Sequence, residues 1–144
     1  MIELATQHLS LSTKGFNDII DITPQLQRML SESSFVEGNM LVFVPGSTAG
    51  LTTIEFESGL ERDIKEFFEE WIPMNRRYHH NERWHDGNGY AHVRAAMLKP
   101  SLMIPFVNQT LQLGTWQQVI LVDFDNRPRQ RKLVVQLNGK VESV

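Results

Sequence analysis

Residues 116–137 read WQQVILVDFDNRPRQRKLVVQL and carry the clearest strand signal in the chain. Two apolar runs, both rich in branched side chains, flank the polar segment Asp125-Asn126-Arg127-Pro128. Branched and aromatic residues favour strands, whereas Asp, Asn and Pro favour turns. The pattern predicts strands over Trp116–Phe124 and Arg131–Leu137, joined as a hairpin, and therefore a fold with much antiparallel sheet.

Further strands are predicted outward from this segment. The run 39–44 is nearly all apolar, which is typical of a strand buried on both faces, and Pro45-Gly46 ends it. Residues 4–12 and 15–22, on either side of Lys14-Gly15, suggest an opening hairpin. The remaining strands are expected at Leu51–Phe56 and Leu102–Val107.

Three helices are expected. Thr23-Pro24 begins one that ends near Ser33, with Thr23 as the capping residue. Ser58 and Glu61 form a capping-box pattern for a second helix, which ends before Pro73. Its apolar residues lie at helical spacing and are expected in the core: Leu60, Ile64, Phe67, Phe68 and Trp71. Residues 91–98 suggest a short third helix, after a long polar loop over 74–89.

A chain of 144 residues can build one sizeable core, so we expect a single domain over residues 1–144. The elements predict an α+β fold with a large antiparallel sheet or sandwich, two main helices and a short third. A net charge of −3 argues against nucleic acid as a partner. We expect no contact with a membrane and a cytoplasmic location, because residues 1–8 lack a leader pattern and no apolar stretch is long enough to span a bilayer.

Chemically versatile side chains gather in residues 78–92, YHHNERWHDGNGYAH, which hold four of the five histidines. Imidazole binds transition metals and exchanges protons near neutral pH. Since the chain has no cysteine, histidine and carboxylate are its strong metal ligands. We therefore expect a metal or acid–base site in this segment.

The candidate metal ligands are His80, His85, His92 and Asp86, and a carboxylate such as Glu55 could orient a ligating imidazole. The expected cofactor is a divalent ion, zinc or magnesium. The alternative is that these are polar loop histidines, bonded to backbone or water.

Five further side chains could bind a substrate or an anion: Ser47, Thr48, Asn88, Arg94 and Gln117. The loop 45–50 combines glycine amides with two hydroxyls, which can cradle a phosphate or carboxylate, and a guanidinium matches phosphate geometry. The competing interpretations are a tight turn for the loop, a solvated salt bridge for Arg94 and a core position for Trp116, beside Gln117. We assign the basic run 127–132 to solubility at a hairpin tip.

The strings DGNGYAHVRA at 86–95, LKPSL at 98–102 and LQLGTWQQ at 111–118 closely resemble the YjbQ-like proteins, often labelled secondary thiamine-phosphate synthases. The similarity also includes Tyr78-His79-His80, STAGLT at 47–52 and the strand 131–139. It covers most of the chain. The resemblance implies a compact α+β homotrimer with a polar pocket near the subunit boundaries.

The resemblance further implies that His80, His92 and Glu55 converge as the catalytic residues, near a bound metal ion. Asp86, Asn88 and Arg94 would lie close to them. Many relatives carry a histidine at the positions of Gly46 and Tyr90, so the ligand set is expected to differ here, with His85 as the candidate replacement.

Two functions follow from these expectations. The first is a metal-assisted enzyme that acts on phosphorylated small molecules, as in thiamine-phosphate synthesis, with a cation or Arg94 neutralising the leaving pyrophosphate. The second is a non-catalytic homotrimer that binds a metal or an anion. An open coordination position facing a pocket would distinguish the two.

Overall fold

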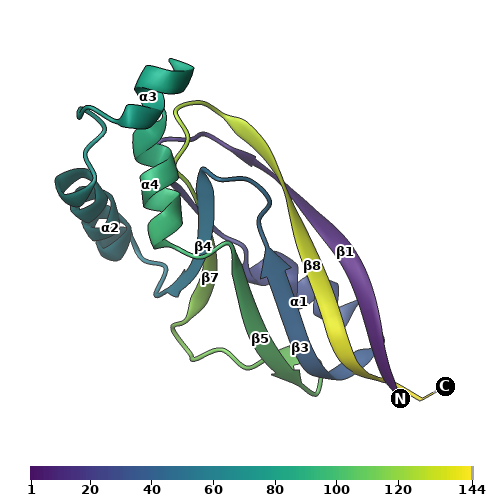
Figure 1. Ribbon diagram of the computed structural model, residues 1–144. Coiled ribbons are helices and arrows are strands. Elements are labelled where there is room, and N and C mark those ends of the chain that lie inside the picture. The colour runs from purple at the N-terminus through teal and green to yellow at the C-terminus, as the bar shows by residue number, and fades with distance from the viewer. Residues whose placement is uncertain (144) are drawn as a thin grey trace.

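The computed structural model describes residues 1–143 as two antiparallel sheets and four helices (Figure 1). Sheet A has the order β1 (Ile2–Thr13), β8 (Arg129–Val141), β3 (Phe35–Phe43), β5 (Ser101–Val107) and β6 (Thr110–Leu111). Sheet B has the order β2 (Asp18–Asp21), β7 (Gln118–Asp123) and β4 (Ala49–Ile54). The helices are α1 (Thr23–Ser31), α2 (Ser58–Trp71), α3 (His79–Trp84) and α4 (Gly89–Met97). The α+β class is confirmed.

Both predicted hairpins are wrong, because their strands lie in different sheets. β8 pairs with β1 and β3, whereas β7 pairs with β2 and β4. After β1 the chain leaves sheet A and enters sheet B at β2, through a turn in which Gly15, Phe16 and Asn17 all have positive φ. Strand patterns identify strands but do not identify their partners.

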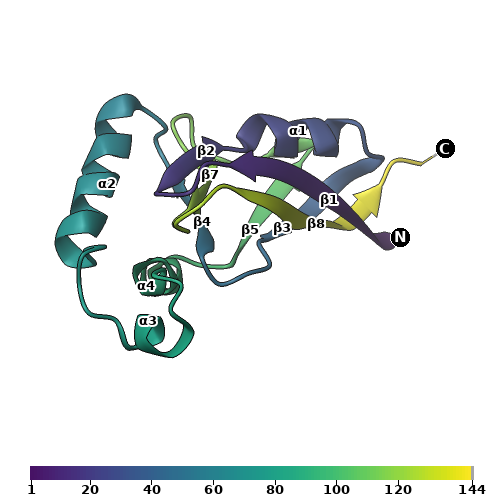
Figure 2. The same ribbon diagram turned by 90° about the horizontal axis from the view of Figure 1, so that it is seen from above.

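The two sheets and the helices form successive layers (Figure 2). Alternate residues of β7 face opposite cores: Val119 and Leu121 contact the core shared by sheet A and α1, while Ile120 and Val122 lie beneath α2 and α4. β7 is thus the strand buried on both faces. The same prediction for residues 39–44 is wrong, since Phe43 is 39% exposed on the outer face of sheet A.

The three predicted helices are confirmed, with differences at their ends and on one face. Glu57, rather than Ser58, caps α2 by accepting hydrogen bonds from the backbone of Gly59 and Leu60. Thr23 is the first residue of α1 and makes no capping bond. Phe67 and Trp71 are more than half exposed, so the core-facing part of the predicted stripe is Phe68, which is buried, and Ile64, which packs against the same core while partly buried.

The expected loop 74–89 contains the additional helix α3. A polar helix this short has no apolar periodicity by which the sequence could reveal it. No helix within residues 1–143 combines the length and apolarity needed to cross a membrane. At one end of sheet B, the loop after β3, the loop after β7, α3 and the start of α4 meet (Figure 1). The backbone of Phe124 donates to the Thr48 carbonyl at 2.9 Å and ties the two loops together there.

Candidate functional site

Two fully buried aspartates form the base of the site where β7 ends. Asp123 accepts hydrogen bonds from Thr13 Oγ1 at 2.6 Å and from Arg131, whose Nε and Nη2 lie 2.7 and 2.9 Å from its two oxygens. A two-pronged pairing of this kind fixes a guanidinium in one orientation. Arg131 also donates to Thr48 Oγ1 at 2.8 Å, which links β8 to the loop after β3.

Asp125 makes the second set of contacts. It accepts from Thr48 Oγ1 at 3.0 Å, Asn88 Nδ2 at 3.2 Å and Arg129 Nε at 2.8 Å. Burial by itself would raise the pKa of Asp125, but the hydrogen bonds from Asn88, the Asn126 backbone, Arg129 and Thr48 outweigh it and lower that pKa to about 2. The carboxylate is therefore charged at neutral pH and holds three walls of the site in place.

Above this network lies a polar cavity of about 480 Å³. Its lining comes from the loop after β3, from α3 and α4, and from the start of β8: Gly46, Ser47, Thr48, His80, Trp84, Asp86, Asn88, His92, Asp125, Arg129 and Arg131. Six residues expected at a site from the sequence are thus brought together: Ser47, Thr48, His80, Asp86, Asn88 and His92. They offer donors, acceptors and titratable groups to one small volume.

His80 from α3 and His92 from α4 form a stacked pair at the cavity wall. Their ring centroids lie 4.2 Å apart and the ring planes are tilted by 37°. Burial lowers the pKa of His92, and the nearby His80 lowers it further. His92 is therefore neutral at pH 7 and can accept a hydrogen bond through one ring nitrogen while donating through the other.

Two buried polar atoms at this cavity have no hydrogen-bond partner among residues 1–143: His80 Nδ1 and Asn88 Oδ1. His80 Nδ1 lies 3.5 Å from Asp86 Oδ1 and makes no hydrogen bond with it. Leaving a buried polar atom without a partner costs about 1–3 kcal/mol. Such atoms at a cavity indicate contacts that a bound molecule or water would complete.

The described side chains do not fit the zinc or magnesium site expected from the sequence. Among residues 1–143, no group of three or more histidine, cysteine, aspartate or glutamate side chains is arranged to hold a metal ion. His80 and His92 stack on one another rather than converging with Asp86 on a common point. His85 lies outside the cavity lining, exposed at the end of α3 in a left-handed conformation with φ 58°.

Three other expected site residues also lie outside the polar cavity. Glu55 is exposed after β4. Gln117 donates to Thr53 Oγ1 and lines a separate hollow. Arg94 is fully buried, where it bonds to the Ile72 carbonyl and to Glu69. The structure therefore does not place Glu55 beside either histidine of the pair.

Tyr90 and Gly46, the positions at which the resemblance implies histidine in many relatives, have distinct surroundings. Tyr90 is buried, its hydroxyl has no partner within residues 1–143, and burial raises its pKa to about 12. Gly46 has a φ of +114°, and a Cβ added there would lie 3.1 Å from Arg131 Nη1. A glycine at position 46 therefore leaves one edge of the Arg131 guanidinium uncovered.

Sequence reasoning missed five residues of this site: Trp84, Asp123, Asp125, Arg129 and Arg131. The basic run 127–132, assigned to solubility, in fact supplies the two buried ion pairs. A signal was present, since Asp123 and Asp125, like Arg129 and Arg131, are two residues apart and share one face of an extended chain.

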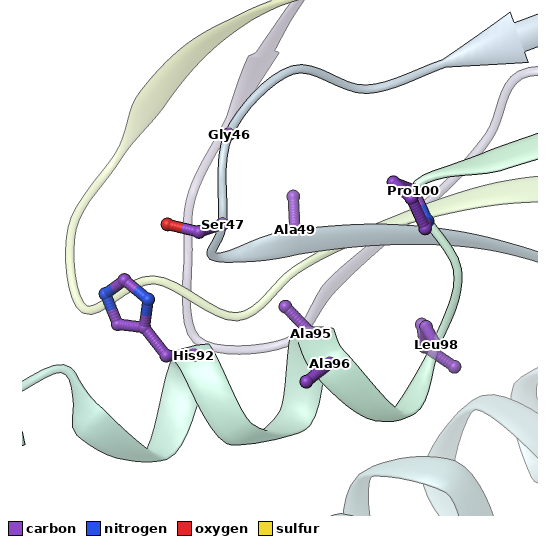
Figure 3. Close-up of a pocket in the computed structure, with 8 residues that line it drawn as sticks. All are labelled: Gly46, Ser47, Ala49, His92, Ala95, Ala96, Leu98 and Pro100. Atoms are coloured by element: carbon purple, nitrogen blue, oxygen red, sulfur yellow. The ribbon is translucent and has the colours of Figure 1, made fainter.

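A second hollow of about 260 Å³ shares part of its lining with the polar cavity, including His92 (Figure 3). Gly46, Ser47 and His92 line both spaces. The rest of its wall is apolar: Ala49, Ala95, Ala96, Leu98 and Pro100.

Known proteins resemble this chain along nearly its whole length. The model of the family described as "UPF0047 protein YjbQ-like" matches residues 7–140. A UPF0047 protein of Archaeoglobus fulgidus is 38% identical over 128 residues, which cover 89% of this chain and 97% of the relative. The UPF0047 protein YugU of Bacillus subtilis is 30% identical over 132 residues, covering 91% and 97%.

Solved structures agree with this. A protein of Sulfolobus solfataricus, described as YbjQ-like and of unknown function, superposes with a TM-score of 0.91 at 30% identity, covering 97% of this chain and 100% of its own. A yjbq/upf0047 protein of Clostridium acetobutylicum, described as uncharacterized, gives a TM-score of 0.81 at 34% identity, covering 94% and 99%.

These findings correct the expected function. The matching family and relatives bring no activity with them in their descriptions, and no metal-holding group occurs in the described part of the chain. The expectation of a metal-assisted enzyme related to thiamine-phosphate synthesis is therefore wrong, and so is metal binding in its alternative, a non-catalytic homotrimer that binds a metal or an anion. The resemblance read from the sequence is confirmed at the level of family: the chain belongs to the YjbQ-like UPF0047 proteins.

Proposed function

We propose that this protein binds a small polar molecule that carries an acidic group, a carboxylate or a phosphate, in the cavity beside His80 and His92. The imidazole nitrogens would exchange hydrogen bonds with that molecule. The observation that carries the proposal is the stacked histidine pair at a polar cavity in which His80 Nδ1 and Asn88 Oδ1 are buried and unpaired.

The unpaired atoms indicate the polarity of the ligand. Asn88 Nδ2 donates to Asp125, so Asn88 Oδ1 is the acceptor that remains, and it suits a hydroxyl or amine of the ligand. Neutral His92 can donate through one ring nitrogen to an acidic oxygen. A ligand with donors and acceptors would therefore satisfy the cavity better than a purely anionic or purely apolar one.

The two arginines at the cavity, Arg129 and Arg131, support the proposal that the ligand carries an acidic group. Arg129 and Arg131 bond to Asp125 and Asp123 through Nε and Nη2, so the Nη1 edge of each stays available to a ligand. Arg131 Nη1 lies next to Gly46 at the lip of the cavity. A guanidinium already fixed by a buried carboxylate loses little side-chain entropy when it binds a second oxygen.

Isothermal titration with sodium acetate and with inorganic phosphate tests this proposal. We expect saturable binding of at least one probe at pH 7, weakened at least tenfold by His80→Phe and by His92→Phe, which keep a ring but remove its nitrogens. His85→Phe is the matched control and should bind like wild type, because His85 lies outside the cavity lining. Equal affinities in all four proteins would contradict the proposed site.

We also propose that the chain assembles with copies of itself, and that the assembly is a homotrimer, as the resemblance implies. The support is the outer face of sheet A, where apolar side chains are exposed on adjacent strands: Phe43 on β3 and Met103 and Val107 on β5. Contiguous apolar surface of this kind is typical of protein interfaces. The cytoplasmic location stays a prediction.

A further inference from the structure

The mostly apolar hollow that His92 shares with the polar cavity indicates that the proposed ligand has a second, apolar part. We infer that the hollow is a subsite for a short aliphatic group, so that the ligand is an organic acid whose acidic end lies in the polar cavity and whose hydrocarbon end lies against α4. This inference rests on the proposed function, because it assumes that the acidic end is held beside His92.

The walls of the hollow are apolar and small. Four of its lining residues are Ala49 on β4 and Ala95 on α4, which are buried, and Ala96 and Pro100, which are exposed (Figure 3). Alanines at facing positions leave open the volume that larger core side chains would fill. The hollow therefore exists because these positions carry alanine rather than a larger apolar residue.

The walls are also held in place. The backbone of Val44 donates to the Pro100 carbonyl at 2.8 Å and that of Leu51 donates to the Lys99 carbonyl at 2.7 Å. A Cβ on Gly50 would lie 2.7 Å from the Leu98 Cβ, so glycine there lets Leu98 approach β4 and close one side. Few degrees of freedom remain to be lost when a hydrocarbon group binds to such a surface.

The two spaces share part of their lining. His92, Ser47 and Gly46 line both of them, and in the close-up the His92 ring and the Ser47 hydroxyl lie at one end of the row of apolar side chains (Figure 3). A linear molecule could thus place its acid at the nitrogens of His92 and continue past Ser47 into the hollow. A volume of about 260 Å³ suits a chain of a few methylene groups rather than a long fatty acid.

Titration with straight-chain carboxylates, from acetate through butyrate and hexanoate to octanoate, tests the subsite. Burial of one methylene group is worth about 0.8 kcal/mol, so the affinity should rise about fourfold per carbon and then level off as the hollow fills. Ala96→Leu should abolish this rise. Met97→Leu, at an exposed neighbouring position of α4 outside both linings, should behave as wild type.

The outcomes separate the two proposals. If acetate and its longer homologues bind equally well, the acidic site stands and the aliphatic subsite is wrong. The same conclusion follows if the rise persists in Ala96→Leu, because the chain then lies elsewhere. If no member of the series and no phosphate binds, the proposed function is wrong and the subsite falls with it.

Discussion

Asp125 joins three parts of the chain that lie far apart in the sequence. Its two oxygens accept hydrogen bonds from Thr48, Asn88 and Arg129, which belong to the loop after β3, the start of α4 and the start of β8. A buried carboxylate with so many donors keeps its charge and fixes the positions of those donors. The walls of the polar cavity are therefore set before any ligand arrives.

This carboxylate should make stability depend on acid pH. Its folded-state pKa of about 2 lies below the ordinary value of 3.8, so its stabilisation is present above pH 3.8 and is lost as the pH falls toward 2. The difference corresponds to about 2 kcal/mol. Urea unfolding at pH 6 and pH 2.5 should show Asp125→Asn destabilised at pH 6 by about this amount or more, with a smaller difference from wild type at pH 2.5.

A gap between wild type and Asp125→Asn that stays constant over this range would show that the charge of Asp125 does not contribute. Glu82→Gln is a useful comparison. Glu82 also has a lowered pKa, caused mainly by its hydrogen bond with Arg77, but it lies at the surface, where ion pairs contribute little.

Arg94 is a structural anchor in this fold. Its guanidinium donates twice to the Ile72 carbonyl, at 2.9 and 2.7 Å, and once each to Asn17 and Glu69 at 2.8 Å. The Tyr90 ring lies beneath it, 5.0 Å from the guanidinium carbon. Most of its donors are thus occupied by the protein itself, which leaves little capacity for the anionic substrate expected from the sequence.

Arg94→Lys should therefore destabilise the protein by about 2–4 kcal/mol, since a lysine keeps the charge but cannot satisfy these separate acceptors. Arg62→Lys is the matched control: Arg62 is 81% exposed and pairs with Glu66 on one face of α2, so its change should stay within about 0.5 kcal/mol. Chemical denaturation of both variants measures this. Similar losses for the two would refute the anchoring role of Arg94.

At the scale of elements, the strand β7 accounts for most of the difference between expectation and structure. Its run of apolar residues identified a strand correctly, but side-chain alternation is the same whether the next strand continues the sheet or enters another one. Arg129 and Arg131 are close to Asp123 and Asp125 in the sequence, but their other partners Thr13, Thr48 and Asn88 lie more than 30 residues away. The sequence close to β7 therefore does not reveal the contacts with these distant residues.

The candidate site, like the strand arrangement, could be predicted only in part from the sequence. The histidine cluster, Asn88 and the loop with Ser47 were visible in the sequence because unusual residue types were close together. The convergence of His80 with His92 depends on α3, a helix of 6 residues that has no apolar stripe to reveal it. Glu55 was expected to orient a histidine ring, but the fold leaves it exposed after β4.

Helix α2 offers a direct comparison of two adjacent aromatic residues. Phe68 is buried with its ring centroid 5.0 Å from that of Phe124, whereas Phe67 is 56% exposed. Phe68→Ala should cost about 3–4 kcal/mol in the free energy of unfolding, and Phe67→Ala less than about 1 kcal/mol. Thermal or urea unfolding tests this. A larger loss for Phe67→Ala would mean that the exposed face of α2 is covered in solution.

At the scale of the whole molecule, sheet A carries α1 and sheet B on one face and exposed apolar side chains on the other. If this outer face is the proposed interface between copies, light scattering should give a mass three times the 16.6 kDa of one chain. Met103→Lys should lower that mass, because it places a charge at a residue that is 64% exposed on this face. Lys65→Glu, on α2, should leave the mass unchanged.

A wild-type mass of 16.6 kDa would contradict self-association. The polar cavity would remain a candidate site in that case, since all of its lining residues come from one chain.

Ligand binding at this cavity can be observed directly in a nitrogen-15 NMR spectrum of the histidine side chains, recorded during titration with inorganic phosphate and with hexanoate at pH 7. We expect saturable shifts of the ring nitrogens of His80 and His92, while those of His8, His79 and His85 stay unchanged. Ring nitrogens of His80 and His92 that do not shift with either probe would contradict the claim that this cavity binds a small organic or inorganic acid.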